Sequence, residues 1–231
     1  MSCQFNAMRA GWRSADLAFL VDVTGSMRPY IEAVKQAIQS IVERANSDGT
    51  SVRVGFIGYR DPFGPSTPPD FQLLAFTRDI PRFRSFVSGL RATGGGDTPE
   101  DVFGALEKAG EDLSWDRGGF RRILFHIADQ PAHGRQYGAR GGLHPGGDPL
   151  GRNLCDILGT LQTKDVIYGF GKITARTDPM LEAFERECGS PIEQYEIDVA
   201  TSRFDVKDGR GGKSAEVANR IVAAIGGLLE D

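Results

Sequence analysis

The sequence predicts an α/β protein in which a doubly wound, mostly parallel sheet carries helices on both faces. Residues 16–23 and 122–128 are continuous apolar runs, a pattern typical of strands buried on both sides of a parallel sheet. Residues 31–45 carry apolar side chains at spacings of three and four, as on one face of an amphipathic helix. Strand and helix patterns alternate along almost the whole chain, which favours a parallel sheet built from βαβ units.

Local signals predict the elements of the N-terminal half. Pro29 suits the first turn of the first helix, and β-branched and aromatic residues indicate the second strand. Thr98 as a cap and Pro99 at the first helical position predict the start of a third helix. The predicted elements are a strand over 16–23, a helix over 31–45, a strand over 52–59, a proline-rich loop over 60–70, a short edge strand over 71–76, a helix from 79 to 90 and a helix from 98 to 113.

The C-terminal half continues the alternation, interrupted by one long loop. Residues 130–151 contain seven glycines and show no periodicity. A loop of this length inside a compact domain is usually functional. The predicted elements are a strand over 122–128, this loop, a helix over 154–161, a strand over 166–170, a helix over 179–187, a strand over 192–199 and a helix over 217–229.

Composition bounds the domain organisation and the partners. The 231 residues are 40% hydrophobic and 25% charged, and they show neither an internal repeat nor a break in composition. The sequence therefore predicts an N-terminal extension over 1–15 and a single domain over 16–231. A net charge of -4 argues against a nucleic-acid binder, because such proteins carry a strongly basic face.

Localisation is predicted from features that the sequence lacks. No apolar run reaches the roughly 20 residues that span a bilayer, and residues 1–15 lack the apolar core of a signal peptide. Cys3, Cys155 and Cys188 are too few and too scattered for a disulfide framework, which fits a reducing compartment. We therefore expect a cytoplasmic protein with no membrane span.

Polar residues gather where the predicted strands end. The first strand is followed by Asp22, Thr24 and Ser26, and the strand over 122–128 is followed by Asp129. A glycine triplet leads into Asp97 and Thr98, and Arg60 and Asp61 follow the second strand; these four residues are expected at the same rim. Hydroxyls mixed with a few carboxylates suit Mg²⁺, so the sequence predicts a metal site at this rim.

The Asp-x-Thr-x-Ser motif at residues 22–26 resembles the metal-ion-dependent adhesion site of von Willebrand factor type A domains. The segments 55–61, 94–101 and 126–134 are most similar to the type A domains attached to α-kinases. The resemblance covers residues 16–229 and implies a sheet with one short antiparallel edge strand, here 71–76. It also implies Mg²⁺ or Mn²⁺ held directly by Thr24 and Ser26, with Asp22 acting through water.

The same resemblance implies two further metal ligands, a threonine from a second loop and an aspartate after the fourth strand. Asp129 matches the aspartate. Either Asp97 or Thr98 can occupy the threonine position. If Thr98 binds the ion, its hydroxyl cannot easily also cap the predicted helix. Some of these residues also have a purely structural alternative. Asp22 can cap a turn, and an Arg60–Asp61 pair can brace a loop.

The predicted function is a non-catalytic interaction module that binds a protein partner, with an acidic side chain of that partner completing the metal shell. Arg60, Asp61, His133 and Arg135, with Arg140, are candidate partner contacts. One alternative is a metal-dependent phosphotransfer or hydrolysis enzyme that uses His133 or Asp61, although neither shows a matched partner in the sequence. Another is a regulatory partner of an α-kinase on a separate chain, since 231 residues leave no room for a kinase domain. A degenerate site on a pure scaffold is a third.

Overall fold

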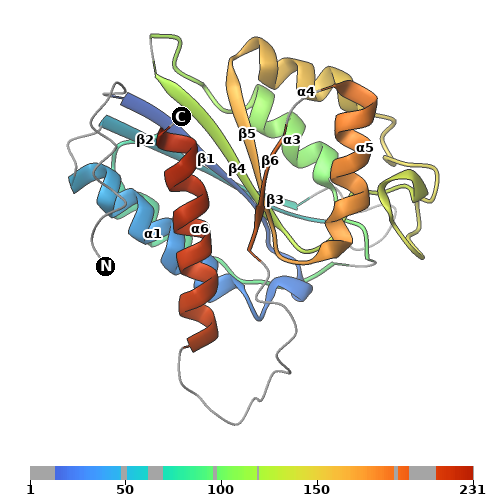
Figure 1. Cartoon of the computed structure of the whole chain (residues 1–231), viewed down its shortest axis with the longest axis horizontal. Helices are drawn as coiled ribbons and strands as arrows, with labels where there is room; N and C mark the ends of the chain where they lie inside the picture. The colour runs from blue at the N-terminus through green and yellow to red at the C-terminus, as the bar shows by residue number, and fades with distance from the viewer. Residues whose placement is uncertain are drawn as a thin grey trace.

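The computed structural model describes residues 14–47, 51–61, 70–95, 98–118, 120–189, 192–197 and 212–230. They form one six-stranded sheet in the order β3-β2-β1-β4-β5-β6, with helices on both faces (Figure 1). The strands are β1 (Ser14–Asp22), β2 (Ser51–Arg60), β3 (Asp70–Thr77), β4 (Arg121–Ala128), β5 (Val166–Lys172) and β6 (Glu193–Glu196). The helices are α1 (Ile31–Ser47), α2 (Ile80–Gly89), α3 (Val102–Glu111), α4 (Leu154–Thr163), α5 (Asp178–Cys188) and α6 (Gly212–Glu230).

The pairing confirms the predicted fold class. β1 pairs in parallel with β2 and β4, β4 with β5, and β5 with β6. β3 pairs antiparallel with β2 at the edge of the sheet, where the short strand over 71–76 was expected. The last strand was predicted over 192–199; β6 ends at Glu196, and residues 198 and 199 lie outside the described ranges.

Two apolar layers hold the helices against the sheet. α1, α2 and α6 cover one face, where Phe19, Phe56 and Phe125 are fully buried. α3, α4 and α5 cover the other face, around Leu20 and Phe170 (Figure 1). Because side chains alternate along a strand, neighbouring residues of β1 serve opposite layers, and this explains its continuous apolar run.

A buried histidine packs among aromatic residues of the second layer. His126 is fully buried on β4, with its ring nitrogens 2.7 Å from the Tyr59 hydroxyl and 2.8 Å from the Tyr168 hydroxyl. Burial lowers the pKa of His126 to about 3, so the ring stays neutral. Its role is therefore structural.

The strand order places the crevice of the domain. The chain leaves β1 to one side toward β2 and later returns to the other side as β4, so the order reverses between β1 and β4. Open α/β sheets bind ligands outside the carboxyl ends of the strands at such a switch point. The residues after β1 and β4 thus meet at one place, as the sequence predicts.

The start of α3 corrects a prediction. The helix begins at Val102 with Asp101 as its cap, whose carboxylate accepts a hydrogen bond of 2.9 Å from the Gly104 N–H. Thr98 lies four residues before the helix and is exposed, so it is not the cap. The cap is displaced because Glu100 pairs across a loop: its N–H donates to the Pro131 carbonyl, and it forms an isolated parallel bridge with Ala132.

The cysteines also differ from the prediction that they form no disulfide framework. Cys155 at the start of α4 and Cys188 at the end of α5 form a disulfide, with Cα atoms 5.1 Å apart. The 33-residue spacing conceals this contact, since only the packing of α4 against α5 brings the two ends together. Separately, none of the described helices is both long enough and apolar enough to cross a bilayer.

Candidate functional site

The turn after β1 brings three oxygen-bearing side chains together. Asp22 ends the strand, and its Oδ1 accepts hydrogen bonds from the Thr24 N–H at 2.8 Å and the Thr24 hydroxyl at 2.6 Å. Ser26 lies in a short 3-10 helix (Gly25–Met27), where its hydroxyl is 3.1 Å from that of Thr24. The turn is thus folded around its own side chains, with Ser26 exposed and Asp22 and Thr24 buried.

The loop after β4 adds a second carboxylate. The Ser26 hydroxyl donates to Asp129 Oδ1 at 2.8 Å, although 103 residues separate the two in sequence. The Asp129 carbonyl accepts from the Thr174 hydroxyl at 2.7 Å, which fixes Asp129 against the loop after β5. We call Asp22, Thr24, Ser26 and Asp129 the rim cluster.

Glu100 joins the rim cluster, and sequence reasoning missed it. It is 2% exposed, and its carboxyl group lies close to the Thr24 side chain across Gly95. Its Oε2 also accepts from the Asp61 N–H at 3.0 Å. The sequence predicts Glu100 in the first turn of the helix over 98–113 and predicts no role for it at the site. The glycines just before it are the signal that could have found it.

Two glycines allow this close approach. Gly94 and Gly95 have φ values of +79° and +87°, which favour glycine. The Gly94 carbonyl accepts from the Gly25 N–H at 3.0 Å, so the glycine-rich loop lies directly on the turn after β1. A Cβ at Gly95 would lie 3.2 Å from Glu100 Oε1 and 3.3 Å from Thr24 Cβ. A side chain there would crowd both residues.

The electrostatics of the rim cluster are unfavourable for carboxylates without a cation. Burial, reinforced by the charge of Asp129, raises the pKa of Asp22 to about 8. Burial, reinforced by the charge of Asp22, raises the pKa of Glu100 to about 10. Asp22 Oδ2 is buried and has no hydrogen-bond partner among the described residues. A divalent cation would offset the repulsion between these carboxylates, and it would give Asp22 Oδ2 a partner.

The donor chemistry fits such a cation. Hard oxygen donors, both hydroxyl and carboxylate, are those that Mg²⁺ and Mn²⁺ prefer. Among the described residues, no group of three or more His, Cys, Asp or Glu side chains could hold a metal ion. A cation at the rim cluster would therefore need the hydroxyls of Thr24 and Ser26 as well as carboxylates.

The remaining predicted site residues are distributed around the rim cluster. Asp97 lies outside the described residues, and Thr98 is exposed. Arg60 does not pair with Asp61; its guanidinium donates to the Thr93 hydroxyl at 3.1 Å and lies 3.4 Å from Asp70. The structure thus brings together Asp22, Thr24, Ser26 and Asp129 and assigns Arg60 a bracing contact.

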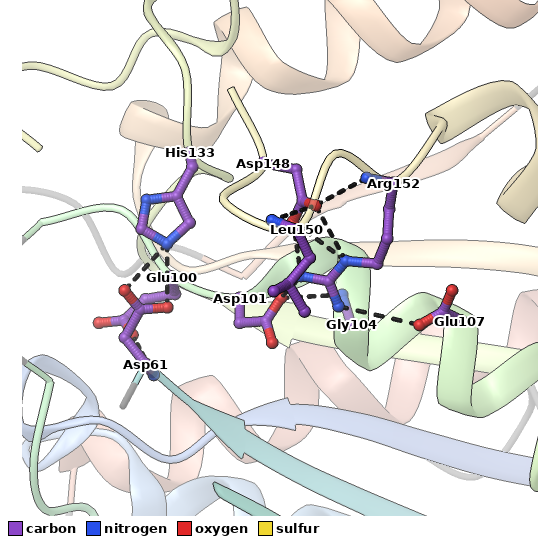
Figure 2. A network of polar contacts seen from close by, with 9 residues as sticks. All are labelled: Asp61, Glu100, Asp101, Gly104, Glu107, His133, Asp148, Leu150 and Arg152. Atoms are coloured by element: carbon purple, nitrogen blue, oxygen red, sulfur yellow. Dashed lines mark hydrogen bonds and ion pairs between the residues drawn. The ribbon is translucent and has the colours of Figure 1, made fainter. Parts of the chain in front are cut away.

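Asp61 and His133 pair with each other, so each has the matched partner that the sequence did not reveal. His133 Nε2 lies 2.9 Å from Asp61 Oδ2, and both side chains are buried (Figure 2). The His144 ring packs edge-on against that of His133, with centroids 5.2 Å apart. Because the Asp61 N–H also donates to Glu100, this pair holds the loops on both sides of Glu100 in place.

A second polar network fixes the long loop over residues 130–153, which we call the rim loop. Arg152 forms ion pairs with Asp148 and with Asp101, and its Nη1 lies 3.9 Å from Glu107 (Figure 2). A Cβ at Gly104 would overlap the guanidinium, so the glycine makes room for it. Within the rim loop, the exposed Arg135 donates its N–H to the Pro145 carbonyl.

Replacing Arg152 with methionine is expected to destabilise the protein by about 3 kcal/mol, because the buried carboxylates of Asp101 and Asp148 would lose their counter-charge. Tryptic cleavage after the exposed Arg140 should accelerate as the rim loop loosens. Urea denaturation and timed proteolysis measure the two effects. Arg186→Met, at an exposed pair with Glu187, is the matched control and should change neither. Unchanged proteolysis in Arg152→Met would contradict the anchoring role.

Comparisons with known proteins show what the chain is similar to. The family model for the von Willebrand factor A domain matches residues 16–136. The alpha-protein kinase vwkA of Dictyostelium discoideum is 38% identical over 187 residues, which are 79% of this chain and 29% of that protein. Integrin beta-7 of Mus musculus is 27% identical over 161 residues, 59% of this chain and 20% of that protein. The chain spans less than a third of the length of either relative.

Proposed function

The chain belongs to the von Willebrand factor A domain family, and we propose that it is a non-catalytic interaction module that binds a protein partner through a divalent cation at the rim cluster. Such domains are protein-interaction modules. One observation carries the proposal: buried Asp22 and Glu100 adjoin Asp129 and two hydroxyls, with Ser26 exposed to solvent. An ion bound there would be held by buried side chains on its protein side and would stay accessible to a partner from the solvent side.

The proposed ligands are the side chains whose oxygens converge there. Thr24 and Ser26 would supply hydroxyls, and Asp22, Asp129 and Glu100 carboxylates that bind the ion directly or hold its waters. Asp97 or Thr98 would add a ligand from the loop before α3, and Thr98 is free to do so because Asp101 caps the helix. Bound Mg²⁺ or Mn²⁺ would supply positive charge that attracts an acidic side chain of the partner.

The enzyme alternative receives less support. A general base must reach its substrate, yet His133 is 3% exposed at its side chain and Asp61 is 8% exposed. Their contacts with each other and with Glu100 favour a bracing role. The likeness to a protein named as an α-kinase supports a place beside α-kinase catalytic domains, on the same or on a separate chain.

In the test, Mg²⁺ is titrated into the wild-type protein and into Ser26→Ala. Calorimetry measures binding, and thermal unfolding measures the change in melting temperature. Mg²⁺ is expected to bind the wild type and raise its melting temperature, and Ser26→Ala should weaken binding at least tenfold. Ser114→Ala, at an exposed serine beyond the C-terminal end of α3, is the matched control. A wild-type protein that ignores Mg²⁺ and Mn²⁺ would favour the scaffold alternative. Turnover of phosphate esters that Ser26→Ala abolishes would favour the enzyme.

The apparent affinity for Mg²⁺ is expected to rise as pH is raised from about 6 to about 8.5, because the ion must displace protons from the rim cluster. The raised pKa values of Asp22 and Glu100 place those protons there at neutral pH. Calorimetry in buffers of different ionisation enthalpy counts the protons released. An affinity that is independent of pH, with no proton release, would show that the carboxylates are already ionised in the metal-free protein.

A further inference from the structure

The disulfide between Cys155 and Cys188 can be reached from solvent on one side. Cys155 is the second residue of α4 and is exposed, whereas Cys188 is the last residue of α5, is half-buried and packs against the second apolar layer. Thiol–disulfide exchange requires a thiolate to reach one of the two sulfurs. An exposed cysteine therefore allows the bond to be opened while the protein stays folded, and exposed disulfides are typically the labile and regulatory ones.

The two cysteines lie at opposite ends of their helices, which makes them electrostatically unequal. Asn153 caps α4, and its side chain accepts hydrogen bonds from the N–H groups of Cys155 at 2.8 Å and Asp156 at 3.2 Å. The positive end of the helix dipole stabilises a negative sulfur at Cys155, and the Asp156 carboxylate opposes this in part. Cys188 lies at the negative end of α5, where a thiolate is disfavoured. Cys155 is therefore the better nucleophile of the two.

The bond fixes the helices on which the rim loop rests. The rim loop ends at the start of α4, and it contacts α5 at two places. The Tyr137 hydroxyl donates to Glu187 Oε2 at 3.2 Å while its ring packs against Phe184, and the Ala132 N–H lies 3.1 Å from Met180 Sδ. Since Glu187 directly precedes Cys188, opening the bond frees the end of α5 that holds Tyr137.

Both helices stay attached to the sheet without the bond. α4 and α5 lie side by side on the same face of the sheet (Figure 1). Each buries four apolar side chains there, namely Leu154, Ile157, Leu158 and Leu161 of α4 and Met180, Leu181, Ala183 and Phe184 of α5. The closed and the opened protein are therefore two folded states that differ in how firmly the rim loop is held.

We propose that the bond between Cys155 and Cys188 is a reversible redox site, at which a small thiol of the glutathione type exchanges with Cys155 and thereby controls the mobility of the rim loop. In the first step the thiolate attacks Cys155 Sγ. A new S–S bond forms between the two sulfurs, the bond to Cys188 breaks, and Cys188 leaves as a thiolate that takes a proton from water. The inference does not depend on an ion at the rim cluster.

A second thiolate completes the reduction. It attacks the sulfur of the small thiol in the mixed disulfide, which releases Cys155 as a thiolate and yields the disulfide of the small thiol. Two small thiols thus supply the two electrons that the protein disulfide takes up. With oxidised glutathione as the oxidant, both steps run in reverse: Cys155 attacks it, and Cys188 then displaces the glutathione from Cys155.

The first test measures whether the bond opens in the folded protein. The protein carries Cys3→Ser, so that Cys155 and Cys188 are its two cysteines. In a glutathione buffer with roughly a hundredfold excess of the reduced form, most molecules are expected to open within hours, and oxidised glutathione should close them again. Alkylation followed by mass spectrometry counts the free thiols. A bond that stays closed in this buffer, yet opens in the same buffer with urea, would overturn the proposal.

The second test asks which cysteine exchanges with the small thiol. Cys188→Ser and Cys155→Ser both lack the bond, so each serves as the control for the other. In oxidised glutathione, Cys188→Ser is expected to form a mixed disulfide at Cys155 at least tenfold faster than Cys155→Ser does at Cys188. Equal rates, or a faster reaction at Cys188, would overturn the assignment of Cys155.

The third test connects the bond to the rim loop. Tryptic cleavage after the exposed Arg140 is expected to be roughly fivefold faster in the opened protein and to return to its original rate after reoxidation. The double variant Cys155→Ser with Cys188→Ser should be cleaved at the faster rate in every glutathione buffer. Circular dichroism follows the fold throughout. Cleavage that does not respond to opening, or an opened protein that unfolds as a whole, would overturn control of the rim loop by this bond.

Discussion

Asp22→Asn is expected to raise the melting temperature of the metal-free protein and, at the same time, to abolish its stabilisation by Mg²⁺. The two effects have opposite signs because they arise from the same buried charge. Without an ion, the Asp22 carboxylate lies beside Asp129 in a fully buried position, and its pKa is raised to about 8. Asparagine has nearly the same shape, and its carbonyl oxygen can still accept the hydrogen bonds from Thr24.

The sign of the pH dependence follows from the direction of the shift. A carboxyl group whose pKa is higher in the folded state than in the unfolded state costs stability above its unfolded pKa of about 3.8. That cost grows until the pH reaches the folded value. In EDTA, the melting temperature of Asp22→Asn minus that of the wild type should therefore be small near pH 4 and increase toward pH 8.

The measurement is thermal unfolding from pH 4 to pH 8.5, in EDTA and in Mg²⁺. In Mg²⁺ the order should reverse, since the variant is expected to bind the ion at least tenfold more weakly. Asp112→Asn, at an exposed pair with Lys108, is the matched control and should follow the wild type in both buffers. A variant that is less stable than the wild type in EDTA at pH 8 would show that Asp22 serves only to cap the turn.

Much of the fold could be predicted because its signals are local. The apolar runs of β1 and β4 need burial on both faces, and this requirement alone places them in the middle of a parallel sheet. The short strand β3 was also found, as was the rim loop with its seven glycines. The residues after β1 and β4 were expected to meet, and the hydrogen bond between Ser26 and Asp129 confirms that they do.

The prediction for α3 failed because a long-range contact outweighed a local rule. Thr98 followed by Pro99 satisfies the local preferences for a helix start, yet the chain at Glu100 pairs with Ala132 on the rim loop and cannot be helical. The helix therefore begins at Val102, and Glu100 turns toward Thr24. The contact between Glu100 and Ala132 determines both where α3 begins and that Glu100 lies at the rim cluster. Neither was therefore predicted.

The pairing of Asp61 with His133 was equally hidden. The two residues are 72 positions apart, and nothing in either neighbourhood indicates the other. Their meeting depends on where β2 and β4 end relative to the sheet, which is a property of the tertiary structure. Contacts of this kind include the bond between Cys155 and Cys188, and they account for most of what the sequence did not show.

Removing the disulfide is the second change with a large expected effect. Replacing both Cys155 and Cys188 with serine, or reducing the bond, should lower the free energy of unfolding by roughly 3–4 kcal/mol, because a loop of 33 residues would no longer be closed in the unfolded chain. For a domain of this size that corresponds to a fall in melting temperature of roughly 10 °C. Cys3→Ser, which leaves the bond intact, should melt like the wild type.

The structure also predicts where the protein would loosen. The bond joins the start of α4 to the end of α5. The rim loop ends at the start of α4, where Asn153 caps the helix, and Tyr137 of the rim loop packs against Phe184 of α5. Hydrogen exchange should therefore accelerate in α4, in α5 and in the rim loop, while β1 and β2 stay protected. Mg²⁺ affinity should change little, because the rim cluster is held by β1 and β4. If the double variant and the oxidised wild type melt at the same temperature, the bond does not stabilise the fold.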